Sequence, residues 1–451
     1  MTLRELVHLF NRASFGLSLD DLVPLQNKSR KEVVDLLFKE ARESTYYPIR
    51  IQQGEIVNPV NGFVLKKYED RTLNDGPWVT ALVTAWLYEM VRTGSIREKV
   101  ALFWHHHMPI NGQTTVLSGL YLECLRKYGL TNFRELLLAV AKTPAMMRFL
   151  DNHHSHKDAP NENWPRELLE LFTLGVGNYT QKDVYEAARA FTGWRYDHDI
   201  NVWTFDPEAH DDGVKEFLGY KGNFSGEQII DIILEQRQCA RHLAAKIYQF
   251  FVHNEEKNHD HVEELATVLY ENDYDLEKVF RHLFLSDWFY SNQVIGQNVK
   301  TPVELLVGFQ RQSGLRAIGV KTNTWFIERM GEVPFHAPNV GGWPVGKDWF
   351  DTNTIVWRRL MPVVLMDIAN REYERGSFTY KLVSRVDKPQ LKELRYVMDS
   401  IFDFERLVRK METTGSDWRV FFMGQYPENF PEALDEQSLK LAVSSAWYQM
   451  A

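Results

Sequence analysis

The sequence predicts a mainly α-helical globular protein, and three observations support that fold class. Apolar residues recur every three or four positions along most of the 451 residues, whereas the alternation typical of strands is scarce. Gly (26) and Pro (17) together make up under a tenth of the chain, and the aromatic content is 13%. Two cysteines are too few for a disulfide framework. We therefore expect a large multi-helix domain with long ordered loops rich in aromatic residues, Gly and Pro.

The expected helices follow from this periodicity in chain order. Two N-terminal helices flank a turn at residues 17–20. A buried helix then runs from Trp78 to Gly94, and Ser95 caps the next helix, which ends before Pro109. Further helices are predicted at 118–128, 132–141, 164–174, 180–192, 226–236, 240–252, 259–270, 275–285, 302–313, 323–331, 355–371, 388–401 and 434–449.

Three stretches interrupt the helical pattern. Residues 45–76 carry several Gly and Pro, and we expect a small β hairpin or an irregular excursion there. Residues 195–224 and 333–354 are rich in Trp, His, Asp, Gly and Pro, and ordered loops of this length often carry function. No repeat or flexible linker marks a boundary. The chain is therefore treated as one continuous domain, 1–451, with a motif-bearing half, 1–224, and a second helical half, 225–451, that carries the 333–354 loop.

Composition excludes several classes of protein. The net charge of −9 argues against a nucleic-acid binder, which would show basic stripes. No uncharged apolar run reaches the length of about 18 residues that a membrane span needs. The N-terminus shows no signal peptide, which predicts a cytoplasmic protein as written, or an envelope or periplasmic protein if the chain is a processed form. Motifs for phosphate loops, dinucleotide binding, serine hydrolases and zinc proteases are missing.

Three consecutive histidines form the first candidate site. His105, His106 and His107 lie at the end of a predicted helix and, at about 100° per residue, point in three directions, so at most one or two can share a site. One interpretation is a helix C-terminus whose dipole favours cationic histidine. The other is a functional site, because a second histidine-rich segment follows at 151–156.

The helix after that segment carries two carboxylates. Asn163, Glu167 and Glu170 follow at i, i+4 and i+7, which places them on one polar stripe. Two carboxylates on one face can bind a divalent ion or act as acid and base. The alternative is an ion pair between Arg166 and Glu170, with Glu167 near the positive end of the helix dipole.

Two loops complete the candidates. His210 and Asp211 suit metal binding or general base catalysis, and the alternative is an Asx-turn with surface charges. The segment 334–349 contains Trp343 and predicts a rigid aromatic loop that stacks a sugar or a peptide, or else fills the helical core.

These segments carry a set of motifs that covers nearly the whole chain. The motifs lie at 8–16, Phe103-Trp104 with His107, 160–171, 173–176, Tyr179-Thr180, Asp183-Val184, Ala187, 192–194, His210-Asp211 with Lys215 and Gly219, 338–340 and 342–344. In this respect the sequence resembles the bacterial family known as domain of unknown function eighteen-hundred. The resemblance implies no settled activity. It implies a bacterial protein, often exported, that is often encoded beside a sulfatase-like partner protein.

Most of the motif residues are polar and lie on well-separated segments, so their convergence would indicate a site. The preferred hypothesis is a helical enzyme that hydrolyses a glycan or an ester, with one divalent metal ion (zinc, manganese or iron) as candidate cofactor. The candidate catalytic residues are Glu167, Glu170, His107, His210 and Asp211, beside Glu162; the candidate metal ligands are His107, Glu167, Glu170 and His210; the candidate substrate-binding residues are Arg166, Lys215, Trp194, Trp343 and Asn163. The rival hypothesis is a non-enzymatic assembly protein that binds a glycan, a peptide or a partner, its polar motifs forming a buried structural network.

Overall fold

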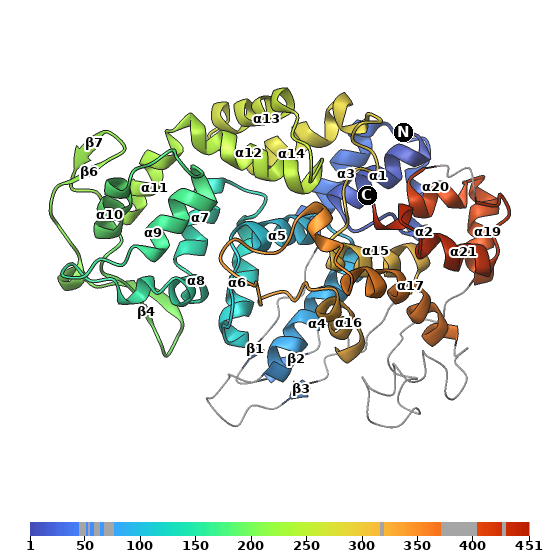
Figure 1. The fold of residues 1–451 in the computed structure, drawn as a ribbon, viewed down its shortest axis with the longest axis horizontal. Helices are drawn as coiled ribbons and strands as arrows, with labels where there is room; N and C mark the ends of the chain where they lie inside the picture. The colour runs from blue at the N-terminus through green and yellow to red at the C-terminus, as the bar shows by residue number, and fades with distance from the viewer. Residues whose placement is uncertain are drawn as a thin grey trace.

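The structure is mainly helical, which confirms the predicted fold class. This computed structural model describes residues 1–44, 51–52, 55–57, 64–66, 76–315, 320–370, 404–425 and 430–450. Figure 1 shows that the helices from α7 to α11 and the strands β4, β6 and β7 lie at one end of the molecule, whereas the two chain termini lie towards the other end. Helices α5 and α12 and the loop before α17 lie between these ends.

The helices follow one another with short connections over most of the chain. Up to residue 190 they are α1 (Leu3–Ala13), α2 (Leu19–Leu25), α3 (Arg30–Glu43), α4 (Gly76–Thr93), α5 (Ile96–His107), α6 (Thr115–Tyr128), α7 (Phe133–Ala141), α8 (Pro144–Phe149), α9 (Asn163–Glu167) and α10 (Gln181–Ala190). Beyond it they are α11 (Gly226–Leu234), α12 (Arg237–Phe251), α13 (His259–Glu271), α14 (Leu276–Leu285), α15 (Pro302–Ser313), α16 (Val320–Arg329), α17 (Thr354–Asn370), α19 (Phe404–Thr414), α20 (Trp418–Met423) and α21 (Glu436–Val443). The 3-10 helices are η1 (Asn152–His154), η3 (Pro207–Ala209), η4 (Asp287–Tyr290), η5 (Gly346–Trp349) and η7 (Trp447–Gln449), and η2 (Leu168–Thr173) is a π-helix.

Short antiparallel strands occupy two of the three interruptions. The predicted 45–76 hairpin region holds β1 (Ile51–Gln52), β2 (Glu55–Val57) and β3 (Val64–Lys66), paired in that order. In the 195–224 region β4 (Trp194–Asp197) pairs with β5 (Val202–Phe205), and β6 (Lys215–Phe217) pairs with β7 (Tyr220–Gly222). The hairpins β4–β5 and β6–β7 were not expected, because strands of three or four residues are too short to show a clear alternation of apolar and polar residues. The 333–354 region contains η5, and α17 begins at its last residue, Thr354.

The turn expected at 17–20 and the helix expected at 434–449 differ from the structure. Within the turn expected at 17–20, α2 begins at Leu19, because the side chain of the preceding Ser18 accepts a hydrogen bond from the backbone N–H of Asp21 (3.2 Å) and so caps the helix. The helix expected at 434–449 ends early and resumes as η7, and α8, α19 and α20 were not expected. The helix predicted at 388–401 lies outside the described residues.

The helix predicted at 164–174 changes type after Glu167. From there the chain continues as η2, in which the backbone N–H of Leu174 donates to the carbonyl of Leu169, five residues back (3.0 Å). The hydroxyl of Thr173 donates to the carbonyl of Leu168, also five residues back (2.5 Å). π-Helical turns of this kind occur frequently at functional sites.

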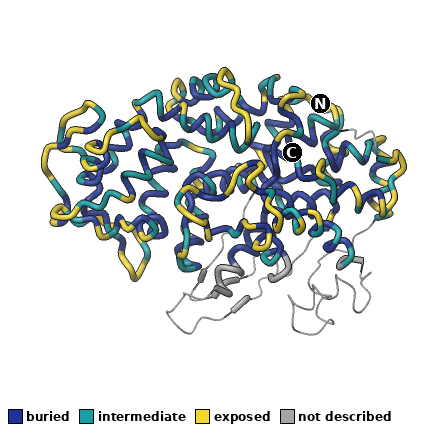
Figure 2. The backbone as a smooth tube through the Cα atoms, viewed as in Figure 1, coloured by how far each residue is buried: buried dark blue, intermediate teal, exposed yellow. Residues whose placement is uncertain are grey.

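One hydrophobic core extends from α1 to η7, since the buried apolar side chains of these elements form a single contact cluster. Figure 2 shows this burial running along the helices in the middle of the molecule. Trp194, predicted to bind substrate, is 1% exposed and belongs to this core. A separate small cluster lies under the loop before α17 and consists of Val299, Ala337, Trp343 and Trp349.

Candidate active site

A pocket lies between the C-terminal end of α5, one face of α12 and the loop before α17. Its wall includes Phe103, His106, His107, Lys246, Phe250 and Trp343. Its empty space is about 740 Å³, a figure that includes open solvent at the mouth. Of the site residues predicted from the sequence, His107 and Trp343 line this pocket.

Each of the three histidines at the end of α5 has its own partner, as rings about 100° apart on a helix should. The Nε2 of His105 accepts a hydrogen bond from the backbone N–H of Phe335 (2.8 Å), which ties the loop to the helix. Burial lowers the pKa of His105 well below its usual value, so the ring is neutral and its lone pair is available as an acceptor.

His106 is oriented by a buried carboxylate. Its Nε2 lies 2.6 Å from Oε1 of Glu332, which is 1% exposed, and Oε2 of Glu332 accepts from the backbone N–H of Val303 (2.7 Å). Because a carboxylate only accepts hydrogen bonds, Nε2 carries the ring proton. Among the described residues, Nδ1 of His106 has no hydrogen-bond partner. A carboxylate-oriented imidazole in a pocket wall is the arrangement of a general base.

His107 contacts the backbone at the C-terminal end of the π-helix. The last carbonyls of a helix have no partner within it, and here Phe172 O faces Nε2 of His107 (3.0 Å) while Leu171 O faces Nε2 of His242 (2.9 Å). Burial, with the positive charge of Lys246, holds the pKa of His107 well below its usual range. His107 therefore stands in the pocket wall as a neutral ring whose Nε2 is committed to the backbone.

The loop before α17 approaches α5 through a glycine. Gly342 has φ +86°, and a Cβ at this position would lie 2.6 Å from the carbonyl oxygen of His106. Only glycine allows this backbone conformation together with this close approach. The next residue, Trp343, is 5% exposed, and its ring centroid lies 5.0 and 4.9 Å from those of His105 and His106. Trp343 is thus a packed wall of the pocket.

Buried charges lie behind the pocket, where α1, α5 and α15 meet. Glu304 lines the pocket and forms ion pairs with Lys99 and with Arg12, the latter at 3.6 Å. Its Oε2 accepts from the backbone N–H of Thr301 (2.7 Å). Burial alone would raise the pKa of Glu304, but Lys99 and Arg12 lower it to about 2. Glu304 therefore stays ionised at neutral pH and cannot donate a proton.

Helix α12 supplies pocket residues that the sequence analysis did not single out. Lys246 and Gln249 line the pocket on successive turns, and Asn254 lines it just beyond the helix. Polar residues at this spacing on an amphipathic helix are also the pattern of a solvent-exposed face, so the sequence signal is ambiguous. The pairing of His106 with Glu332 was missed for a different reason, because the two residues lie 226 positions apart in the chain.

The two carboxylates predicted on one stripe are half-buried and lie near each other. Glu170 accepts a hydrogen bond from the Tyr179 hydroxyl (2.7 Å), and burial together with Glu170 raises the pKa of Tyr179 to about 12. Burial and then Glu170 also raise the pKa of Glu167. Neither carboxylate lines the pocket. A single cleft that combines them with His107 stays a prediction.

Arg166 pairs with Glu162 rather than with Glu170. Its guanidinium lies 2.8 Å from Oε2 of Glu162 and 3.0 Å from Oε1 of Gln181. Glu162 precedes Arg166 by four residues, whereas Glu170, the partner considered from the sequence, follows Arg166 by four residues. Asn163 is exposed on the same helix. These residues form a small surface network at the start of α9.

His210, Asp211 and Lys215 form another group, around the two hairpins. Asp211 accepts two hydrogen bonds from Arg189 (2.7 and 3.1 Å), which lower the pKa of its carboxyl. Lys215 Nζ donates to the backbone carbonyl oxygen of Asp211 (2.6 Å). Nδ1 of His210 lies 2.8 Å from the backbone carbonyl oxygen of Thr192. The structure thus brings these three predicted residues together, but none of them lines the pocket.

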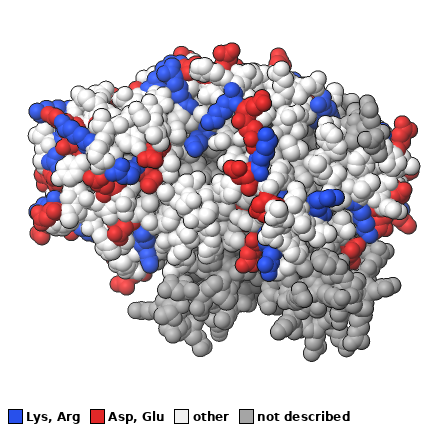
Figure 3. Space-filling model, viewed as in Figure 1, with Lys and Arg blue, Asp and Glu red and all other residues white. Residues whose placement is uncertain are grey.

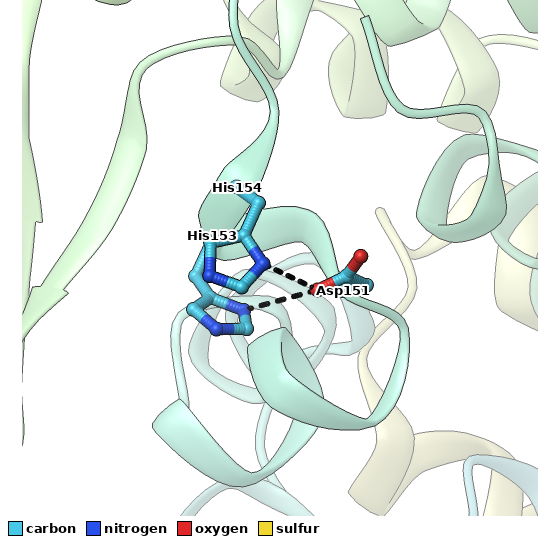
Figure 4. A group of neighbouring side chains, drawn as sticks. All are labelled: Asp151, His153 and His154. Atoms are coloured by element: carbon cyan, nitrogen blue, oxygen red, sulfur yellow. Dashed lines mark hydrogen bonds and ion pairs between the residues drawn. The ribbon is translucent and has the colours of Figure 1, made fainter.

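One group of metal-ligating side chains is present within the described residues. Asp151, His153 and His154 bring one ligand atom each within 4.8 Å of one another (Figure 4). Nδ1 of His154 lies 2.7 Å from Oδ1 of Asp151, whereas Nδ1 of His153 lies 3.9 Å from it and 3.1 Å from Met147 O. The metal ligands predicted from the sequence are His107, Glu167, Glu170 and His210. These four side chains do not form a group of this kind within the described residues, and metal binding by them stays a prediction.

On the face drawn in Figure 3, acidic and basic side chains lie interspersed rather than gathered in one basic patch. No helix in the described part of the chain combines the length and the apolar character that a bilayer crossing requires.

The fold and the pocket define a mainly helical protein with a histidine–carboxylate pair in a partly aromatic pocket. The chain belongs to the family described as "Protein of unknown function (DUF1800)", which matches residues 8–449. This agrees with the resemblance seen in the sequence motifs. No curated protein and no solved structure matches the chain.

Proposed function

We propose that this protein is a hydrolase that cleaves an ester in the pocket at the end of α5, with His106 as the general base. The observation that carries the proposal is the 2.6 Å contact between His106 and the buried Glu332, which leaves Nδ1 without a protein partner in a residue of the pocket wall. A base held by an orienting group within a pocket is the usual arrangement for activating a nucleophile.

In the proposed reaction, Nδ1 of His106 takes a proton from a water molecule while the water oxygen attacks the carbonyl carbon of the ester. The tetrahedral adduct then collapses, the bond to the alcohol oxygen breaks, and the imidazolium returns its proton to the departing alkoxide. The products are the acid and the alcohol. Glu332 stabilises the transient imidazolium.

An ester suits the pocket better than a glycosidic bond. Glycoside hydrolysis commonly uses two carboxyl groups, one of which is protonated and donates to the leaving oxygen. Glu304 lines the pocket, but its pKa of about 2 keeps it ionised. Glu332 does not line the pocket, and its two oxygens accept hydrogen bonds from His106 and from the backbone.

The test measures hydrolysis of p-nitrophenyl acetate by the full chain. We expect His106→Gln to lower kcat/KM by roughly 10²–10⁴-fold, the usual contribution of a general base. Glu332→Gln should lower kcat/KM less and change the pH profile of the reaction. Exposed imidazoles also hydrolyse this ester slowly, so His156→Gln, in an exposed loop, is the matched control. A folded His106→Gln protein with the wild-type rate would refute the proposal.

Ligand binding without chemistry is the second candidate. It is favoured by the hydrogen bonds that Asp211, Lys215 and Arg166 make within the protein, as expected of a structural polar network. In that case the pocket would bind its ligand equally well in wild type and His106→Gln, and neither would turn over an ester. A divalent metal cofactor, an envelope location and a sulfatase-like partner are further proposals, and they rest on the sequence motifs and the family resemblance.

A further inference from the structure

Lys246 presents an uncompensated positive charge to the pocket. It is half-buried on α12 and, among the described residues, its Nζ has neither a hydrogen-bond nor an ion-pair partner. Burial lowers its pKa, and the positive charge of Lys257 lowers it further. Lys99 and Lys215, by contrast, direct their Nζ atoms to protein oxygens. A partly buried ammonium without a partner is costly, and an anion in the pocket would compensate it.

The charged side chains behind the pocket do not oppose an anion. Basic side chains outnumber carboxylates there, and the residues are Arg12, Lys99, Lys300 and Arg358 against Glu304 and Glu332. Because burial lowers the pKa of Lys300 to about 7, this lysine is only partly charged at neutral pH, and the other three cations still exceed the two carboxylates. Glu304 is the acidic residue of the pocket wall, and its charge is balanced by Lys99 and Arg12. The summed charge of this region therefore favours a negative ligand.

Two amide side chains beside Lys246 offer uncharged polar groups. Within the described chain, the amide of Gln249 has no hydrogen-bond partner, and it lies on the same face of α12. Asn254 donates its Nδ2 to Val299 O (3.1 Å), which fixes Oδ1 as an acceptor. That Oδ1 is buried and has no hydrogen-bond partner among the described residues. The amide of Gln249 is not buried in this way, and it offers a donor and an acceptor to a hydroxyl group of a ligand.

We infer that the pocket binds a hydroxylated acid of about the size of a sugar acid, with its anionic group on Lys246 and a hydroxyl group on Gln249. The apolar side chains of Phe103 and Phe250 supply a wall against which the C–H groups of a sugar ring pack. This inference rests on the proposed function, because it names the substrate class of the same pocket. The ester to be cleaved would be a second group of the same molecule.

The test measures equilibrium binding of three probes to the full chain by titration calorimetry: sodium D-glucuronate, D-glucose and sodium sulfate. We expect glucuronate to bind saturably and about tenfold or more tighter than glucose, because only glucuronate can form the charge-assisted bond to Lys246. Sulfate, which lacks the hydroxyl groups of a sugar, should bind more weakly than glucuronate. Lys246→Met should remove the preference for glucuronate over glucose, and Lys246→Arg should retain it.

Lys257→Met is the matched control, since this neighbouring lysine is exposed and its charge is screened by solvent. We expect it to change the glucuronate affinity by less than about threefold. The inference is overturned if wild type shows no saturable glucuronate binding, if glucose binds as tightly, if sulfate binds as tightly, or if a folded Lys246→Met protein keeps the preference.

The two proposals fail in different ways. His106→Gln should bind glucuronate like wild type while losing ester hydrolysis. Normal hydrolysis by His106→Gln, together with lost glucuronate preference in Lys246→Met, would refute the proposed function and support the ligand class. Lost hydrolysis in His106→Gln, together with a kept preference in Lys246→Met, would support the function and refute the ligand class.

Discussion

The pocket wall and the hairpin region differ in how far their polar side chains satisfy one another. Around the hairpins, the carboxylate of Asp211 binds the guanidinium of Arg189, and Lys215 donates to backbone carbonyls. In the pocket, Nδ1 of His106 and Nζ of Lys246 have no protein partner within the described residues. Both regions are rich in polar residues on separate chain segments, so sequence patterns make them look alike.

This difference shows which polar residues have capacity left for a ligand. A side chain whose donors and acceptors are all used inside the protein holds the fold together, because removing its partner would leave a buried group unsatisfied. A side chain that lines a pocket with a free donor or acceptor can bind a substrate without that cost. On this criterion we propose that the pocket is the functional site and that the hairpin region is structural.

The largest expected effect is on the buried charges behind the pocket, which hold its wall in place. Glu304→Gln removes the counter-ion of Lys99 and Arg12 and leaves buried cations, so we expect the free energy of unfolding to fall by about 3–5 kcal/mol. Urea unfolding at pH 7 measures it. Glu263→Gln, which breaks more exposed pairs with Arg237 and Arg241, is the control and should cost less than about 1 kcal/mol. Equal losses in the two variants would contradict the prediction.

A smaller stability loss without loss of chemistry is expected in the hairpin region. Asp211→Asn weakens the bidentate bond to Arg189, and we expect unfolding to become easier by about 1–3 kcal/mol. Because Arg189 lowers the pKa of Asp211, wild type should lose this contribution as the pH falls below the ordinary carboxyl range, and the variant should not.

The neighbouring Asp212 is exposed, so Asp212→Asn is the control and should change stability by less than about 0.5 kcal/mol. Ester hydrolysis should be the same in both variants as in wild type. A drop in hydrolysis by a stably folded Asp211→Asn protein would place the hairpin region in the functional site and remove the distinction drawn above.

The fold could be predicted largely because its information is local. Helix periodicity and caps are properties of neighbouring residues, so most of the predicted helices appear close to their expected bounds. The π-helix after Glu167 could not be predicted, because the same residues also fit an α-helix and the carbonyls left at its end are satisfied from elsewhere, by His107 and His242. The hairpins around β4 to β7 are too short to show their alternation.

The candidate site depends on long-range pairing, and there the sequence was less informative. Helical spacing correctly indicated that the three histidines of α5 point apart, but not which of them meets a carboxylate. Glu332 lies between the helix predicted at 323–331 and the loop predicted at 333–354, and that pattern indicates no partner for its carboxylate. Lys246 lies on an amphipathic helix, where the polar face gives no sign that a loop covers it.

The pH dependence of the free energy of unfolding should differ between a buried lysine and an exposed one. Burial lowers the pKa of Lys300 to about 7. Between about pH 7 and its ordinary value of about 10.5, the unfolded lysine holds a proton that the folded one has released, so stability should rise with pH. Lys300→Met should remove up to about 1.4 kcal/mol of this rise per pH unit. Unfolding midpoints at pH 7 and 9 measure it, and an unchanged rise in the variant would contradict it. The exposed Lys257→Met is the control.

The smallest expected effect concerns the carboxylates predicted to share a cleft with His107. Tyr179→Phe removes one hydrogen bond to Glu170, and we expect a loss of about 0.5–1.5 kcal/mol with ester hydrolysis unchanged. Tyr185→Phe, at an exposed position of α10, should cost less. If hydrolysis falls in Tyr179→Phe while stability is kept, Glu170 works together with the pocket. The functional site would then extend from α5 to the π-helix, because His107 already joins the two through Phe172.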